Sequence, residues 1–130
     1  MASFRTSLSR ARGLGSAKHG VSQWIAERIS AVALVPLVLW AVYSGLMLSV
    51  ASYQVAVLWL HAPLNAVLMV LLIGVGFWHM HAGLRVAVED YVETGLLRAG
   101  VLMANLFVCV LGASLAIFSI LKVALMGGVS

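Results

Sequence analysis

Long stretches without any charged residue dominate the chain and are separated by short polar segments. No Asp, Glu, Lys or Arg occurs in the 56 residues between Arg28 and Arg85, and none occurs in the 23 residues between Arg98 and Lys122. A helix needs roughly 20 apolar residues to cross a bilayer core, so the first gap has room for two spans and the second for one. The sequence therefore predicts an all-α membrane protein with three transmembrane helices. Their expected ranges are 24–50, 57–88 and 97–126, in an anchor domain of residues 24–130 that follows a tail of residues 1–23.

Capping and helix-breaking residues refine these ranges. Ser22 is a candidate N-cap of the first helix. Pro36 should kink that helix, which membrane helices tolerate where neighbouring groups satisfy the freed backbone. The second helix is expected to begin near Ala56 or Pro63, because proline is favoured in a first helical turn. The remaining boundaries are expected at a loop over residues 89–97, which contains Gly95, and at Gly127 and Gly128.

The composition indicates a membrane protein and argues against other classes. Hydrophobic residues make up 63% of the chain and charged residues 9%, whereas soluble domains have about half and about a quarter. The net charge of +4 does not indicate nucleic-acid binding, because the basic residues are not interleaved with aromatic residues on a folded face. The single cysteine, Cys109, lies in the third apolar stretch, so a buried thiol is expected there rather than a disulfide or a metal centre.

The basic residues are distributed unevenly across the expected membrane. Seven of the eight lie in the tail, at the adjoining helix ends or by the second loop, and the first loop holds none. The positive-inside rule therefore places the N-terminus and the 89–97 loop on the cytoplasmic side, and the bacterial inner membrane is the expected location. The tail is also serine-rich and free of acids, as mitochondrial targeting peptides are, so the mitochondrial inner membrane is the alternative.

Ionisable residues gather at the end of the second apolar stretch, where they are costly to place and usually mark a site. Residues three and four apart share a helix face, so His79 lies beside Gly76 and Gly83, which leave a flat strip for a planar macrocycle. His81 points about 200° away around the helix and has bulkier neighbours. His79 is therefore the expected ligand of a haem iron. The alternative for either histidine is a hydrogen bond across a helix pair and no other role.

Asp90 and Tyr91 follow where this helix meets the membrane surface. A continuous helix would place Tyr91 about 18 Å along the axis from His79. A tyrosine hydroxyl can donate to a quinone carbonyl and a carboxylate can orient that hydroxyl, so the pair suits a quinone head group. An interface tyrosine in an acidic loop explains the same residues. Arg28 could pair with Glu27, anchor to a lipid phosphate or meet a haem propionate.

Two segments of the chain resemble one known family, the hydrophobic membrane anchor D subunits of succinate dehydrogenase, respiratory complex II. In the first segment, Gly-Ser-Ala at residues 15–17 precedes an Arg-x-Ser/Thr-Ala pattern that begins at Arg28. The second segment follows the family's His-x3-Gly-x6-Asp-Tyr spacing. Its matching residues are His79, Gly83, Asp90 and Tyr91. Length, three spans and orientation also fit, so the resemblance covers nearly the whole chain.

The resemblance implies roles for individual residues. His79 would be one axial ligand of haem b, with the second ligand supplied by a partner, the second membrane anchor protein of the complex. Tyr91 would donate a hydrogen bond to a ubiquinone carbonyl, with Asp90 beside it. Arg28 would lie near a haem propionate and the quinone pocket. His81 lies outside the family pattern.

The resemblance also implies partners. A flavoprotein subunit and an iron–sulfur subunit would dock on the cytoplasmic face and deliver electrons. This chain itself would hold no succinate site, because it lacks both a dinucleotide-binding glycine fingerprint and a set of cysteines for clusters. Two other functions stay open from the residues alone. One is an anchor without haem, and the other is a small proton- or ion-conducting subunit of another complex, in which His79 and His81 would relay protons.

Overall fold

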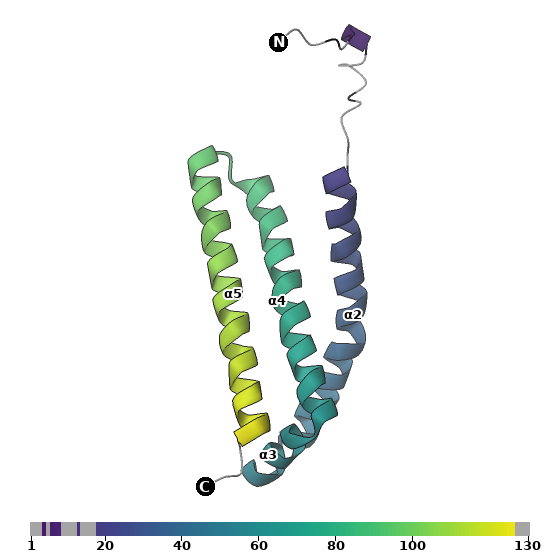
Figure 1. Ribbon diagram of the computed structural model, residues 1–130, viewed down its shortest axis with the longest axis vertical. Helices are drawn as coiled ribbons and strands as arrows, with labels where there is room; N and C mark the ends of the chain where they lie inside the picture. Colours follow the sequence, from purple (N-terminus) through teal and green to yellow (C-terminus); the bar gives the residue numbers. More distant parts are fainter. Residues whose placement is uncertain (1–3, 5, 9–12, 14–17, 127–130) are drawn as a thin grey trace.

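The chain forms a layer of long helices in the computed structural model, which describes residues 4, 6–8, 13 and 18–126. Four helices of the described residues are labelled in Figure 1. They are α2 (Lys18–Leu48), α3 (Tyr53–His61), α4 (Pro63–Tyr91) and α5 (Gly95–Met126). Most of the expected tail, and the expected helix stop at Gly127 and Gly128, lie outside the described residues.

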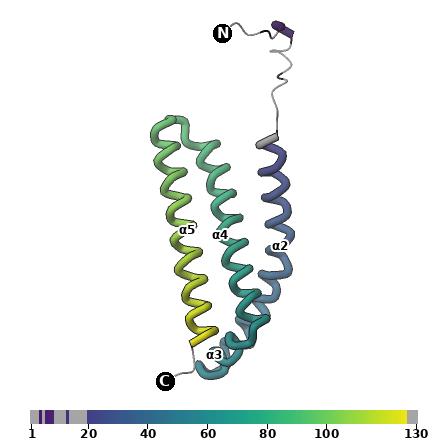
Figure 2. The backbone as a smooth tube through the Cα atoms, viewed as in Figure 1, coloured from purple at the N-terminus to yellow at the C-terminus, as the bar shows by residue number. Residues whose placement is uncertain are grey.

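Three of these helices are long and apolar enough to cross a membrane, namely α2 from Gly20, α4 and α5. The expected all-α, three-span architecture is therefore confirmed. In Figures 1 and 2, α4 lies between α5 and α2, and it contacts both. The start of α2 and the connection between α4 and α5 lie at one end of the layer, and the short α3 lies at the other. The expected topology requires this arrangement, with the start of α2 and the end of α5 on opposite sides.

The second apolar stretch differs from the single helix expected over residues 57–88. It is divided at Ala62, whose backbone is extended (φ −66°, ψ 121°), and Pro63 then occupies the first turn of α4. Proline lacks the N–H that would continue α3, and the Asn65 side chain donates instead to the carbonyl of Trp59 at 2.9 Å. Apolar composition alone does not reveal this break, because the residues on both sides of it are hydrophobic.

Three other helix ends also lie beyond the expected limits. The first helix begins at Lys18, so Ser22 lies inside it and is not its N-cap. Helix α4 continues to Tyr91 and α5 begins at Gly95, which reduces the expected 89–97 loop to residues 92–94. An ion pair one turn apart, Arg85 to Glu89 at 2.9 Å, favours the helical state of these last turns.

A proline and two tryptophans lie toward the end of the layer that contains α3. Pro36 lies inside α2 as expected, and Figure 1 shows α2 bending in its second half. Trp40 of α2 stacks on Trp59 of α3, with ring centroids 5.6 Å apart. This stacking joins α3 to α2, while α3 also contacts α4 and α5.

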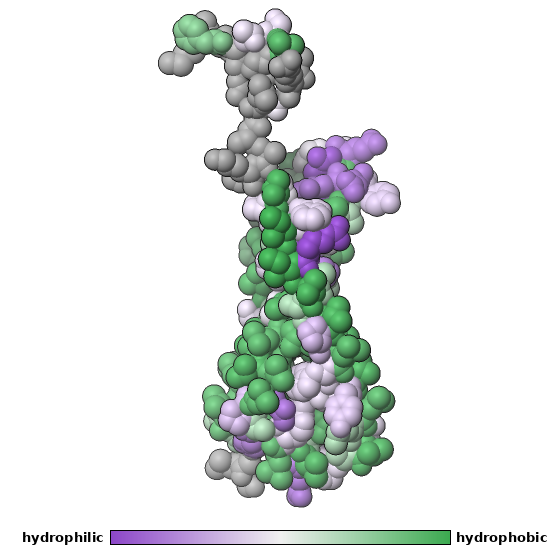
Figure 3. Space-filling model, turned by 90° about the vertical axis from the view of Figure 1, so that its right-hand side faces the viewer, coloured by the Kyte–Doolittle hydropathy of each residue, from purple (hydrophilic) through white to green (hydrophobic). Residues whose placement is uncertain are grey.

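The side chains between the helices are mostly small or polar, and the large apolar ones mostly face outward. The buried residues among those described are Ser30, Ser44, Leu60, Ala82 and Cys109. Figure 3 shows hydrophobic residues over most of one face, with hydrophilic residues gathered toward one end of it. Lipid tails are as apolar as leucine, so membrane helices associate through close packing of small residues and through polar contacts. Gly112 of α5 illustrates this packing, since a Cβ there would lie 2.7 Å from Cε1 of Phe77.

Candidate functional site

His79 of α4 faces α2 and is bonded to a buried serine. Its Nδ1 lies 2.9 Å from Oγ of Ser30, a residue that is only 7% exposed. The same hydroxyl donates to the carbonyl of Glu27 at 2.8 Å. A hydroxyl has one proton to donate, so Ser30 Oγ accepts from His79 and Nδ1 carries the hydrogen. The lone pair of the neutral His79 ring is therefore on Nε2.

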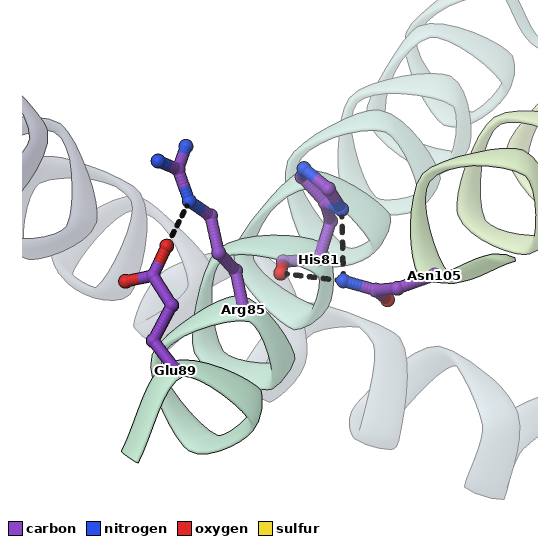
Figure 4. Close-up of polar contacts among 4 residues, drawn as sticks. All are labelled: His81, Arg85, Glu89 and Asn105. Carbon is purple, nitrogen blue, oxygen red and sulfur yellow. Dashed lines mark hydrogen bonds and ion pairs between the residues drawn. The ribbon is translucent and has the colours of Figure 1, made fainter. Parts of the chain in front are cut away.

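His81 faces α5 (Figure 4), and its Nδ1 accepts a hydrogen bond whereas Nδ1 of His79 donates one. Nδ2 of Asn105 lies 3.1 Å from the His81 carbonyl oxygen and 3.1 Å from its Nδ1. Only the amide nitrogen can donate to a carbonyl, so this contact fixes the orientation of Asn105, and His81 Nδ1 accepts the second N–H. The Sγ of Cys109 donates to Oδ1 of the same amide at 3.4 Å. The hydrogen of the neutral His81 ring is therefore on Nε2.

These two hydrogen bonds separate the histidines chemically. A metal binds the imidazole nitrogen that has a lone pair, and the hydrogen bond of the other nitrogen decides which one that is. His79 offers Nε2 for this purpose, whereas His81 has its lone pair engaged by Asn105. Both rings also make the hydrogen bond across a helix pair that the alternative interpretation expects. That interpretation accounts for the lone pair of His81, which accepts from Asn105, but leaves the lone pair on Nε2 of His79 without an assigned role.

Open apolar space adjoins His79. The ring borders a cavity of about 390 Å³ whose other lining residues belong to α2. At Gly83 nothing lies within 4 Å of an added Cβ, and at Gly76 only Leu34 Cδ2 approaches, at 4.0 Å. A flat apolar group can approach the backbone there. The residues lining the cavity with His79 are Ala31, Leu34, Val35, Val38 and Leu39.

The described residues do not form a cluster of metal ligands around His79. Within the described residues, no group of three or more His, Cys, Asp or Glu side chains could hold an ion. A haem carries most of its iron's ligands in its own macrocycle, so this chain would need to supply only one side chain. The donor set of His79, with a free Nε2 beside an apolar cavity, therefore fits haem b better than a bare metal ion.

Asp90 and Tyr91 are exposed in the last turn of α4, and Tyr91 is 87% exposed. Because α4 is continuous, Tyr91 lies about 18 Å along the axis from His79. Asp90, eleven residues after His79, falls within about 20° of the same helix face, and Tyr91 falls about 120° away. Both side chains are available to a ligand or a partner at this end of the layer, and neither is placed against His79.

Arg28 stacks on an aromatic ring. Its guanidinium carbon lies 5.3 Å from the ring centroid of Trp24, a cation–π geometry. Within residues 18–126 the ion pair is Arg85 with Glu89, so the expected alternative of pairing Arg28 with Glu27 is not what the structure adopts. Arg28 nevertheless follows directly after Glu27, whose carbonyl ends the hydrogen-bond chain from His79.

Spacing along the sequence gives no role to the two residues that distinguish the histidines, Ser30 and Asn105. They lie 49 and 24 positions from their partners, so no local pattern connects them. The available signal is their polarity, since polar side chains inside apolar spans tend to bond across helices. Ser30 also occupies the Ser/Thr position of the Arg-x-Ser/Thr-Ala pattern that the sequence resembles, and both residues allowed there carry a hydroxyl.

Comparisons with known proteins agree with a three-span membrane anchor. The family model of the succinate dehydrogenase/fumarate reductase transmembrane subunit matches residues 2–121. A curated relative, the succinate dehydrogenase hydrophobic membrane anchor subunit of Rickettsia bellii (strain RML369-C), is 28% identical over 101 residues. The match covers 78% of this chain and 81% of that protein. No solved structure matches the chain at a significant level.

Proposed function

Because the chain belongs to the succinate dehydrogenase/fumarate reductase transmembrane subunit family, we propose that it contributes to haem b and ubiquinone binding in a succinate:ubiquinone oxidoreductase. That it is a multi-pass membrane anchor subunit follows from the family and from its three apolar helices. The observation that carries the haem proposal is the free Nε2 of His79, next to an apolar cavity. A haem b bound there would accept and release single electrons.

The chain's own residues would hold the haem in two ways. Nε2 of His79 would be one axial ligand, and the second ligand would come from the second membrane anchor protein. A second side-chain ligand from that protein would leave the iron without an open position, which would favour electron transfer over oxygen chemistry. Arg28 would leave Trp24 to meet a propionate, because an arginine fork suits a carboxylate. Its exposure and its stacking on Trp24 make that movement possible without breaking an ion pair.

Ubiquinone would be reduced at the end of α4. The Tyr91 hydroxyl would donate to a quinone carbonyl and Asp90 would orient it, as their exposure in the last helical turn permits. Within the described residues no wall encloses that position. The iron–sulfur protein and the second anchor protein would complete the pocket and exclude water, and the flavoprotein would supply electrons from succinate.

We infer the orientation of the chain from where its charges lie. The start of α2 and the α4–α5 connection share one end of the layer, and Arg28, Arg85 and Arg98 lie toward that end. The positive-inside rule then favours this end in the cytoplasm of a bacterium, with the protein in the inner membrane. A mitochondrial inner membrane, with the same end in the matrix, is the alternative.

Copurification with a visible spectrum tests this function. The chain is produced with its neighbouring subunits, purified through an affinity tag, and analysed by mass spectrometry and by dithionite reduction. Recovery of a flavoprotein, an iron–sulfur protein and a second anchor, together with a reduced b-type band, is the expected result. The same partners without any b-type band would mean an anchor without haem. Ion flux through the isolated chain in proteoliposomes would instead favour a conducting subunit.

The quinone role is tested by Tyr91→Phe, which removes the hydroxyl donor and keeps the ring. Quinone reduction by the purified complex should fall by about 10-fold or more, since a lost hydrogen bond of roughly 1.4 kcal/mol corresponds to that factor. Succinate oxidation with an artificial dye should persist. Equal loss of both activities would show an assembly defect and remove the support for a quinone contact at Tyr91.

A further inference from the structure

Ser30 is a buried polar side chain inside a membrane-spanning helix, and its hydroxyl is engaged on both sides. It accepts from Nδ1 of His79 at 2.9 Å and donates to the Glu27 carbonyl at 2.8 Å. The direction of these two hydrogen bonds cannot reverse, because a backbone carbonyl only accepts. The hydrogen bond between α2 and α4 therefore fixes a single tautomer of His79.

Such a bond has a recognised effect on a histidine that ligates a metal. Ligating histidines almost always donate their second ring N–H to an acceptor, which sets the tautomer, holds the ring plane and raises the basicity of the ligating nitrogen. In a low-dielectric interior, hydrogen bonds in series also polarise one another. The series from His79 through Ser30 to Glu27 has this form, and it joins two membrane-spanning helices.

We propose that Ser30 is a positioning residue for His79, holding Nε2 ready as a haem ligand and tuning its donor strength. This inference rests on the proposed haem ligation by His79. It assigns to α2 a part in the haem site in addition to the contact suggested for Arg28. It also explains why a polar side chain occupies one of the few buried positions among the described residues, where an alanine would pack without a hydroxyl to satisfy.

The test compares two buried serines of α2 in the intact complex. Ser30→Ala removes the acceptor for His79, whereas Ser44→Ala removes a hydroxyl of similar burial, 6% exposed, further along the same helix. Three readouts are taken for each complex: haem content per flavin, the electron paramagnetic resonance spectrum of the oxidised haem, and its midpoint potential by redox titration.

Ser30→Ala should lower the haem content per flavin, because losing an outer partner of a metal ligand usually weakens binding by about 10- to 100-fold. The haem that remains should have a more positive midpoint potential, because a weaker imidazole donor stabilises ferric iron less. Ser30→Thr keeps the hydroxyl and should restore the wild-type potential. Ser44→Ala should leave all three readouts unchanged. If Ser30→Ala fails to assemble, Ser30→Cys keeps a weak acceptor of similar size and should shift the potential in the same direction.

Further outcomes separate this proposal from the function on which it rests. A wild-type complex without haem, or haem that persists in His79→Leu, would overturn the proposed haem ligation together with the role of Ser30. Haem that depends on His79 but keeps its spectrum and potential in Ser30→Ala would overturn the role of Ser30 alone. Equal changes in Ser30→Ala and Ser44→Ala would do the same, because they would reveal a general loss of packing.

Discussion

The interface between α2 and α4 and the interface between α4 and α5 each engage one histidine of α4 through its Nδ1 atom. At the first interface His79 donates to a hydroxyl that is already donating elsewhere. At the second, His81 accepts from an amide nitrogen that also donates to a carbonyl. Two histidines separated by one residue therefore carry their ring hydrogens on opposite nitrogens.

This difference shows that the partner of a membrane histidine decides its chemistry more than its place in the sequence does. Both rings lie in the same apolar span and at nearly the same depth. At the α4–α5 interface the lone pair of His81 accepts a hydrogen bond from Asn105, which links the two helices. The amide of Asn105 in turn accepts from Cys109. The α2–α4 interface leaves a lone pair available beside an apolar cavity. Cavities of about 360 and 320 Å³ also lie between α4 and α5 beside His81, so the interfaces differ in which histidine keeps an available lone pair and not in the room beside it.

The largest expected effect on stability comes from overpacking the α4–α5 interface with Gly112→Val. An added Cβ would lie 2.7 Å from Phe77, and such overpacking costs about 1–3 kcal/mol. The thermal dissociation midpoint of the purified complex should fall, while assembled complexes keep the wild-type haem spectrum. Gly100→Val on the same helix is the control, because nothing lies within 4 Å of a Cβ there. Equal effects of the two substitutions would show that helix propensity, and not contact with Phe77, is responsible.

A smaller effect is expected for Asn105→Leu, which removes both amide donors and keeps a similar side-chain volume. Interhelical hydrogen bonds in membranes contribute modestly, so the loss should be about 1–2 kcal/mol, measured as the same dissociation midpoint. The haem spectrum and potential should stay unchanged, since His81 is not the expected ligand. Cys109→Ala should also lower the dissociation midpoint, by a smaller amount. A haem signal altered by Asn105→Leu to the extent expected for Ser30→Ala would break the contrast between the two interfaces.

The smallest effect is expected for Arg85→Ala. The pair of Arg85 with Glu89 is exposed on α4 (Figure 4), and exposed ion pairs contribute between about 0 and 1 kcal/mol. The dissociation midpoint should barely move, and haem content should match the wild type. A drop in the midpoint as large as that of Gly112→Val would mean that Arg85 contacts a partner protein or lipid. Stability would then depend on contacts outside the α4–α5 interface.

The sequence predicts the spans well because the membrane imposes a simple length rule on uncharged stretches. It does not predict the break at Ala62, since Pro63 both starts one helix and stops the one before it, and hydropathy does not distinguish these roles. Its charged residues predict a loop from residue 89, but ion pairing favours a helix that continues as far as Tyr91.

Local spacing in the sequence predicts some residues of the candidate site and not others. Spacing along one helix places His79 beside two glycines and turns His81 to another face. The hydrogen-bond partners come from other helices, so neither Ser30 nor Asn105 can be assigned without the packing of α2 and α5 on α4. The positions of Tyr91 and Arg28 relative to a ligand depend on partner proteins, and the haem and quinone roles of these residues stay predictions.

The most direct test of the contrast between the histidines is the dithionite-reduced spectrum of the purified complex carrying His79→Leu or His81→Leu. Leucine removes both ring nitrogens in each case and keeps an apolar side chain of moderate size. We expect His79→Leu to lose or strongly shift the b-type band, and His81→Leu to retain it at wild-type haem content. Retention in His79→Leu with loss in His81→Leu would contradict the proposed ligation and assign the ligand to the α4–α5 interface.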